Sequence, residues 1–127
     1  MPGTVLVTGI SGYIAKHCAL ALLSAGYRVR GTVRKQAKAD QVRATLARHA
    51  DIANLEFVEA DLLSDAGWSE AVRDCGGILH LASPFPLAAP KDENDLIRPA
   101  VDGTLRVLKA ARAGKVKRFV QTSSVAA

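Results

Sequence analysis

Residues 4–15 read Thr4-Val5-Leu6-Val7-Thr8-Gly9-Ile10-Ser11-Gly12-Tyr13-Ile14-Ala15, and this stretch decides the fold. Thr4–Thr8 has the character of a short buried strand, and Gly9 and Gly12 follow it, with the small residue Ala15 three positions later. Small residues between a strand and a helix permit a tight turn, let a pyrophosphate approach the amides at the helix N-terminus, and let the helix pack closely on the strand. The stretch therefore predicts a nucleotide-binding turn, although two glycines can also merely punctuate a strand-to-helix connection.

Outward from this stretch, apolar segments alternate with helical patterns. We predict strands at residues 4–8, 27–33, 55–60, 77–81 and 117–122, and helices at residues 13–25, 40–50, 66–73 and 94–113. The apolar residues at helical spacing in the first helix are Ile14, Cys18, Ala21 and Leu22. Gly26 is expected to end that helix, and Asp40 to cap the start of the second one. Asn94 or Asp95 caps the fourth, with Pro99 near enough to its first turn to be tolerated.

Strands that alternate with helices and lack tight hairpin signals favour a parallel sheet, because parallel neighbours need a long crossover that a helix can supply. Right-handed crossovers then predict an α/β fold: a Rossmann-type doubly wound parallel sheet in three α/β/α layers, with strand order 3-2-1-4-5. No repeat or low-complexity linker divides the chain, so we expect residues 1–127 to form a single NAD(P)-binding domain. Ligands of such sheets bind beyond the carboxyl ends of the strands, where the strand order reverses.

The end of the second predicted strand carries positive charge. No Asp or Glu occurs between Gly9 and Lys38, whereas Arg34, Lys35 and Lys38 follow the strand. An acidic residue here would accept hydrogen bonds from a ribose 2′-hydroxyl and repel a 2′-phosphate, whereas a guanidinium binds a phosphate with two parallel hydrogen bonds. We therefore predict NADP, in its reduced form NADPH, as the cofactor, with Arg34 as the main contact of the 2′-phosphate and Lys38 as a weaker one. The alternative is a solvated basic loop.

Composition excludes several other classes of function. The net charge is +5, but Lys and Arg are spread along the chain and acidic residues are interleaved from Asp40 onward, so no nucleic-acid partner is expected. The apolar runs are far shorter than the roughly 20 residues of a membrane span, and no basic leader precedes the first strand, so we expect a cytoplasmic protein without a membrane partner. Two cysteines without a CxxC pair and three scattered histidines lack metal-ligand spacing, so no metal is assigned.

Six motifs stand in order along the chain. They are Val7-Thr8-Gly9-Ile10-Ser11-Gly12-Tyr13-Ile14-Ala15, Tyr27-Arg28-Val29-Arg30-Gly31-Thr32-Val33-Arg34, Ala60-Asp61-Leu62, His80-Leu81-Ala82-Ser83-Pro84, Glu93-Asn94-Asp95-Leu96-Ile97-Arg98-Pro99-Ala100-Val101-Asp102-Gly103-Thr104-Leu105 and Arg118-Phe119-Val120-Gln121-Thr122-Ser123-Ser124. Each is weak alone, but in this order they resemble the extended short-chain dehydrogenase/reductases, specifically the branch of dihydroflavonol reductases and cinnamoyl-CoA reductases. The resemblance covers essentially all of the chain.

The resemblance implies which residues meet the cofactor. They are Gly9, Ser11, Gly12, Tyr13 and Ile14 in the first loop, Arg34 and Lys38 at the 2′-phosphate, Asp61 and Leu62 beside the adenine, and Leu81, Ala82 and Ser83 along the ribose and nicotinamide. A carboxylate at Asp61 can accept a hydrogen bond from the adenine amine, and small residues in the last loop leave room for the cofactor. From the residues alone, Asp61 is equally a helix cap, and Ser83 a turn residue before a proline.

The resemblance also implies hydride transfer to a carbonyl, assisted by a tyrosine acid, a lysine that lowers its pKa, and a serine or threonine that binds the substrate oxygen. Ser124 matches that serine, although a Ser-Ser pair after a strand is also a common loop feature. Neither Tyr13 nor Tyr27 is followed by a lysine four residues later, so the YxxxK pair and the substrate-binding region are expected beyond Ala127. We therefore expect the truncated N-terminal part of a longer enzyme, inactive or nearly so by itself.

The prediction that follows is an NADP-dependent oxidoreductase acting on CH-OH groups, present as its cofactor-binding part, with a ketone or aldehyde as its small-molecule substrate. A nucleotide-sugar epimerase or dehydratase of the same superfamily is one alternative. Arg34 argues against it, because those enzymes commonly carry an acidic residue after the second strand. The other alternative is a regulator that senses NAD(P) without catalysis. A homodimer is left open, as is association through apolar surface at the truncated edge.

Overall fold

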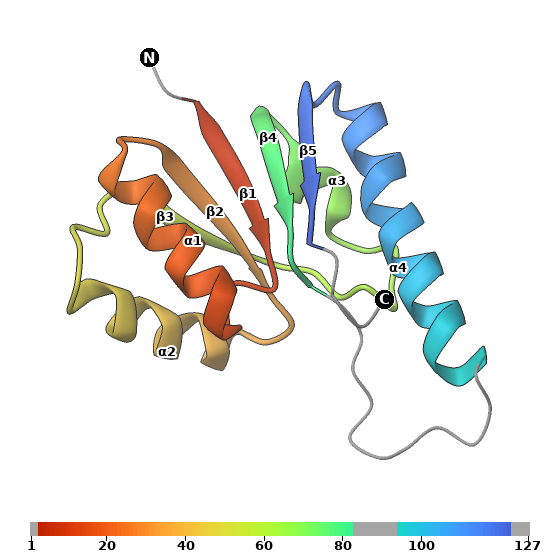
Figure 1. The fold of residues 1–127 in the computed structure, drawn as a ribbon, viewed down its shortest axis with the longest axis horizontal. Helices are drawn as coiled ribbons and strands as arrows, with labels where there is room; N and C mark the ends of the chain where they lie inside the picture. The colour runs from red at the N-terminus through yellow and green to blue at the C-terminus, as the bar shows by residue number, and fades with distance from the viewer. Residues whose placement is uncertain (1–2, 83–93, 123–127) are drawn as a thin grey trace.

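The computed structural model of the chain describes residues 3–82 and 94–122. Figure 1 shows the elements in chain order. They are β1 (Thr4–Thr8), α1 (Tyr13–Ser24), β2 (Arg28–Val33), α2 (Gln36–Ala47), β3 (Leu55–Glu59), α3 (Trp68–Val72), β4 (Cys75–His80), α4 (Asn94–Ala113) and β5 (Arg118–Gln121). The described strands form one sheet in the order β3-β2-β1-β4-β5, and all neighbours in it are parallel. The predicted Rossmann-type sheet and its strand order are confirmed.

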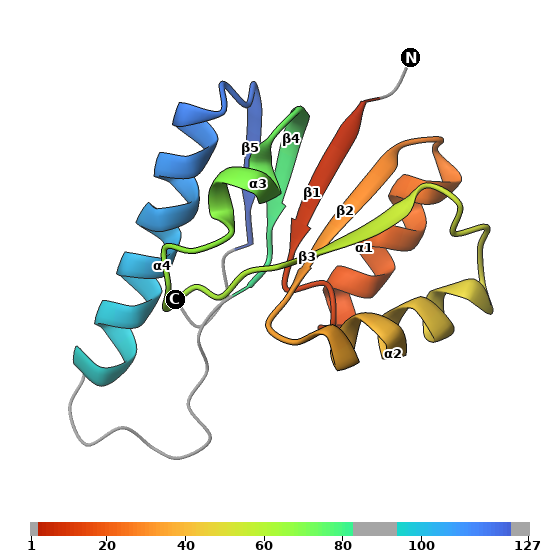
Figure 2. The same ribbon diagram turned by 180° about the vertical axis from the view of Figure 1, so that it is seen from behind.

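Helices cover both faces of the sheet, which gives the predicted three layers. α1 and α2 lie on one face, and α3 and α4 lie on the other (Figures 1 and 2). The core is divided accordingly: Leu6 of β1 belongs to the apolar cluster under α3 and α4, and Val7 belongs to the cluster under α1 and α2. Side chains alternate across a strand, so β1 contributes to both clusters. Within residues 3–82 and 94–122, none of the helices has the length and apolar character needed to cross a membrane.

The side of α1 that faces the sheet differs from the predicted one. The face predicted from spacing consists of Ile14, Cys18, Ala21 and Leu22. In the structure Ala15 and Ala19 are the buried residues, Ile14 is 59% exposed, and of the predicted residues Leu22 packs against the core beneath α1. This part of the prediction is wrong because α1 is apolar on more than one side, so spacing alone does not choose between the sides. The side of α1 with the smallest side chains faces the strands, because small side chains allow the helix to pack closely on them.

The predicted start of the second helix and the predicted caps of the second and fourth helices are also wrong. α2 begins at Gln36, a full turn before Asp40, which lies exposed inside the helix. The apolar stripe of α2 already starts at Ala39, which is fully buried, so packing extends the helix towards β2. α4 begins at Asn94 and includes Asp95, so neither of these residues precedes the helix as a cap.

The other boundaries agree closely with the prediction. Gly26 follows α1 with a φ of +91°, a left-handed conformation that favours glycine and ends the helix as predicted. β4 begins at Cys75, two residues before its predicted start, because Cys75 pairs in register with Thr4 of β1. The register shifts at this point: Thr4 pairs with Cys75 and Val5 with Gly77, so Gly76 has no partner in β1 and forms an irregularity of the kind seen at a β-bulge.

A contact with Gly31 holds the loop after β1 against β2. The side chain of Ile10 is fully buried and lies directly over Gly31, and the Ile10 amide donates to the carbonyl oxygen of Thr32 at 3.2 Å. A Cβ atom built at Gly31 would stand 2.5–2.9 Å from three atoms of the Ile10 side chain. Because protein interiors are packed nearly without voids, position 31 has no room for a side chain while Ile10 keeps its place.

We predict that Gly31→Ala destabilises the chain, because Ile10 must shift within a filled core. Overpacking of this kind costs about 1–3 kcal/mol. Gly76→Ala is the matched control: Gly76 also lies in a strand, but a Cβ atom there would have no neighbour within 4 Å. Its expected effect on the free energy of unfolding is within about 0.5 kcal/mol. Equilibrium urea unfolding measures both variants, and equal stabilities would contradict the packing role of Gly31.

Candidate cofactor-binding site

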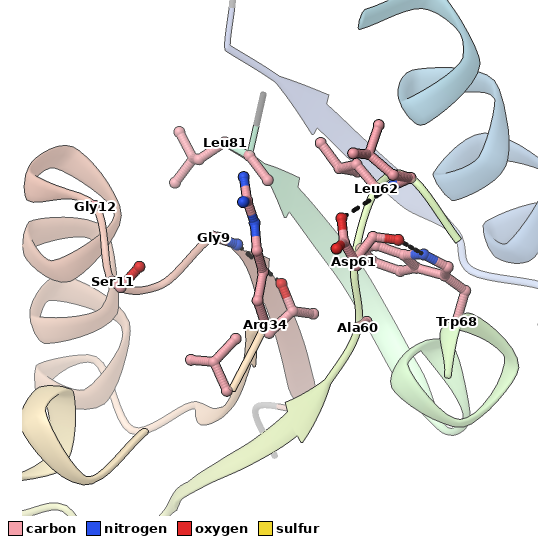
Figure 3. A pocket seen from close by; sticks show the side chains of 13 residues that line it. Gly9, Ser11, Gly12, Arg34, Ala60, Asp61, Leu62, Trp68 and Leu81 are labelled. Atoms are coloured by element: carbon pink, nitrogen blue, oxygen red, sulfur yellow. Dashed lines mark hydrogen bonds between the residues drawn. The ribbon is translucent and has the colours of Figure 1, made fainter. Parts of the chain in front are cut away.

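A pocket lies at the carboxyl ends of β1, β2, β3 and β4, where the strand order reverses (Figure 3). Its walls are the ends of these strands and the loops that follow them, with one residue from α3. The lining residues are Gly9, Ser11, Gly12, Thr32, Val33, Arg34, Ala60, Asp61, Leu62, Leu63, Trp68, Leu81 and Ala82. Open α/β sheets bind their ligands at such a switch point.

The loop after β1 brings main chain, rather than side chains, to the pocket. Gly9 has a φ of +64°, and its amide donates to Oγ1 of Thr32 at 2.9 Å. A Cβ atom at Gly9 would stand 3.0 Å from two carbon atoms of Ala82 in the opposite wall. Gly12 precedes α1 without a side-chain cap, and the first turn of the helix holds no acidic residue. The amides at this helix end are therefore available to an anion.

Arg34 supplies positive charge to the pocket. It follows β2 directly, it is exposed, and its side chain points into the pocket (Figure 3). Among the described lining residues it is the only cationic one, and Asp61 is the only acidic one. A planar guanidinium in this position can form two parallel hydrogen bonds with a phosphate.

Side chains from α3 and α4 hold the loop after β3. The indole Nε1 of Trp68 donates to the carbonyl oxygen of Asp61 at 3.0 Å. Arg106 of α4 donates to the carbonyl oxygen of Leu62 and forms an ion pair with Asp65 at 2.5 Å. The hydrogen bond from this guanidinium lowers the pKa of the Asp65 carboxyl. The wall of the pocket at Asp61 and Leu62 is therefore fixed from two helices.

The carboxylate of Asp61 faces the pocket (Figure 3). Its Oδ1 accepts a hydrogen bond from the amide of Leu63 at 3.0 Å, within the loop itself. α3 begins only at Trp68, after Gly67, so the alternative prediction that Asp61 caps this helix is wrong. A carboxylate accepts about four hydrogen bonds, so Asp61 retains acceptor capacity for a ligand.

Thr8 holds the loop after β4 in the pocket wall. This residue ends β1 and is fully buried. Its Oγ1 accepts hydrogen bonds from the amides of Leu81 at 2.9 Å and Ala82 at 3.0 Å. Two part-buried loop amides that have left the strand ladder thereby gain an acceptor.

The pocket brings together most of the predicted cofactor contacts, and the binding role of each stays a prediction. Those in its lining are Gly9, Ser11, Gly12, Arg34, Asp61, Leu62, Leu81 and Ala82. Tyr13 and Ile14 are not in it, because both project from α1 into solvent, with 78% and 59% of their surface exposed. Lys38 lies within α2 and is not in the lining either. Ser83 and Ser124 lie outside the described residues.

Several residues that shape the pocket were not predicted from the sequence, among them Thr8, which holds the loop after β4. Thr32 anchors the first loop, and Trp68 and Arg106 anchor the loop after β3. Thr32 stands two residues before Arg34 at the end of a predicted strand, a place that could have been recognised. Trp68 and Arg106 gave no local signal, because their partners are 7 and 44 residues away in the chain. In the described part of the chain, no three His, Cys, Asp or Glu residues are grouped to hold a metal ion.

Solved structures and curated relatives match the chain closely. Gre2 of Candida albicans in complex with NADPH has a TM-score of 0.86 and 36% identity, over 99% of this chain and 38% of that one. Yeast methylglyoxal/isovaleraldehyde reductase Gre2, complexed with NADPH, has a TM-score of 0.83 and 31% identity, over 98% and 38%. Dihydroflavonol 4-reductase of Hordeum vulgare is 39% identical over 123 residues, which are 96% of this chain and 35% of that protein. The chain spans about a third of the length of the curated relatives it matches.

A family model described as the NAD dependent epimerase/dehydratase family matches residues 5–127. The match includes every residue that lines the pocket. Together with the relatives, it confirms the resemblance to the extended short-chain dehydrogenase/reductases and to their dihydroflavonol reductase branch. The chain belongs to the NAD dependent epimerase/dehydratase family.

Proposed function

We propose that the chain binds NADPH in this pocket and is the cofactor-binding part of an NADP-dependent oxidoreductase. The observation that carries the proposal is the charge at the end of β2, where Arg34 points into the pocket and no Asp or Glu lies between Gly9 and Lys38. A guanidinium there attracts the 2′-phosphate that distinguishes NADPH from NADH. The two similar reductases that were solved with NADPH support the proposal.

Each wall of the pocket offers a partner to a different part of the dinucleotide. The amides beside Gly12 suit the pyrophosphate, because a helix N-terminus attracts anions. The carboxylate of Asp61 can accept a hydrogen bond from the adenine amine, and Leu81 and Ala82 border the ribose and nicotinamide. The nicotinamide supplies a hydride when bound. The residues of this chain bind and orient the dinucleotide.

For the whole protein we propose reduction of a ketone or an aldehyde to an alcohol. Similar proteins are named for such reactions, among them dihydroflavonol 4-reductase and methylglyoxal/isovaleraldehyde reductase. Ser124 is proposed to hydrogen-bond the substrate oxygen. Residues 1–127 contain no YxxxK pair, so we expect the chain by itself to bind cofactor without turning over a substrate. An epimerase or dehydratase acting on a nucleotide sugar is less well supported, because Arg34 stands where such enzymes commonly carry an acidic residue.

We predict that the chain binds NADPH at least about tenfold more tightly than NADH, because charge-assisted hydrogen bonds contribute about 1.5–3 kcal/mol each. Arg34→Ala should lower the affinity for NADPH to that for NADH. Arg28→Ala is the matched control, since Arg28 is an exposed arginine at the opposite end of the same strand, and it should leave both affinities unchanged. Calorimetric titration of the three proteins with both nucleotides measures these affinities.

Trp68 provides a second readout of the same titration. It is the only tryptophan of the chain and it lines the pocket, so energy transfer to bound NADPH should quench its emission. A folded chain that binds neither nucleotide would contradict the proposed function. Equal affinity for NADPH and NADH in the unmodified chain would contradict only the proposed role of Arg34 and would leave nucleotide binding in this pocket intact.

A further inference from the structure

A buried histidine lies behind the loop after β4. His80 is the last residue of β4, it is 2% exposed, and it stands opposite Thr8 in the register of the two strands. Its Nδ1 lies 2.8 Å from Oγ1 of Thr8. Among the described residues, His80 does not line the pocket, so the proposed function has no use for it.

Counting hydrogens on the Thr8 hydroxyl assigns the tautomer of His80. A hydroxyl has two acceptor lone pairs and one hydrogen. The amides of Leu81 and Ala82 occupy both lone pairs of Thr8, so its hydrogen must be donated to Nδ1 of His80. Nδ1 therefore carries no hydrogen, and the ring is neutral with its hydrogen on Nε2. Burial, which lowers the pKa of His80, favours the same neutral form.

The loop that Thr8 holds is in contact with the loop after β1. Ala82 lies so close to Gly9 that a Cβ atom at Gly9 would be 3.0 Å from its Cα and Cβ atoms. Both residues line the pocket on opposite sides of the switch point. A small movement of Leu81 and Ala82 therefore changes the width of the pocket beside the glycine loop.

We infer that His80 is a positioning residue for the nucleotide: by accepting the Thr8 hydrogen, it directs both Thr8 lone pairs to the amides of Leu81 and Ala82 and so sets the pocket wall. The inference rests on the proposed function, because the wall matters only for a ligand bound there. His80 acts through Thr8 and touches no ligand itself. Without an acceptor at Nδ1, the Thr8 hydroxyl must point its hydrogen elsewhere and loses one of the two loop amides.

A purely structural role for His80 makes a different prediction. The ring also packs against Phe119 of β5, with 5.9 Å between the ring centroids, so it fills space in the sheet. If filling space were its only role, any buried replacement would change stability and nucleotide affinity together. The two roles can be distinguished by substitutions at position 80 that change the hydrogen-bond acceptor and the volume of the side chain independently.

The test compares His80→Asn with His80→Leu in the full chain. The asparagine side-chain oxygen can take the place of Nδ1 and accept from Thr8, whereas leucine fills the space without an acceptor. NADPH affinity is measured by Trp68 quenching, and stability by urea unfolding of the same samples. We expect His80→Leu to weaken NADPH binding on the order of tenfold, and His80→Asn to stay within about threefold, since a lost hydrogen bond to a buried group costs about 1–3 kcal/mol.

A Thr8→Val background shows whether His80 acts through Thr8. Adding His80→Leu to Thr8→Val should cause no further loss of NADPH affinity, because the effects of substitutions within one hydrogen-bond network are not additive. Additive losses, or equal losses for His80→Asn and His80→Leu, would overturn the inference while leaving the proposed function intact. An unmodified chain that does not bind NADPH would instead overturn the proposed function. In that case the role of His80 is tested without nucleotide, by hydrogen–deuterium exchange at the amides of Leu81 and Ala82. Exchange rates in His80→Leu equal to those of the unmodified chain would overturn the positioning role as well.

Discussion

The position of the loop after β1 between two neighbouring strands is the constraint on which the site depends. On one side, Ile10 occupies the space above Gly31 in β2, and on the other, Gly9 is in close contact with Ala82 after β4. Gly31 and Gly9 have no side chain and Ala82 has a small one, so the loop can approach both neighbouring strands closely. These two contacts therefore fix the distance of the loop from β2 and from the loop after β4. The amides at the start of α1 are thereby held at the switch point of the sheet, where an anion can reach them.

The walls of the pocket are held by side chains that reach in from other elements. Oγ1 of Thr32 accepts the amide of Gly9, and Oγ1 of Thr8 accepts two amides of the loop after β4. Trp68 and Arg106 bind carbonyl oxygens of the loop after β3. Each of these bonds satisfies a main-chain group that no strand or helix pairs, which is why loops of this kind can be ordered. Loops that are ordered before binding lose less conformational entropy when a ligand binds, which favours binding.

Local patterns predicted the parts of the molecule that depend on neighbouring residues in the sequence. The strand order follows from alternating strands and helices with right-handed crossovers, and Arg34 was singled out because it follows a predicted strand directly. Asp61 was assigned through the family resemblance. The buried side of α1 was predicted wrongly, because a helix that is apolar on several sides has no unique periodicity. Trp68 and Arg106 were missed, since their roles arise only when α3 and α4 pack beside the loop after β3. Sequence periodicity holds no information on such long-range hydrogen bonds.

Hydrogen–deuterium exchange with and without saturating NADPH tests most directly whether the carboxyl-end pocket is the nucleotide site. We predict slower exchange at the amides of the glycine loop and the start of α1, at Leu62 and Leu63, and at Leu81 and Ala82, with no change at Gly76 near the amino end of β4. Protection confined to the amino ends of the strands, or no protection at saturation, would contradict it.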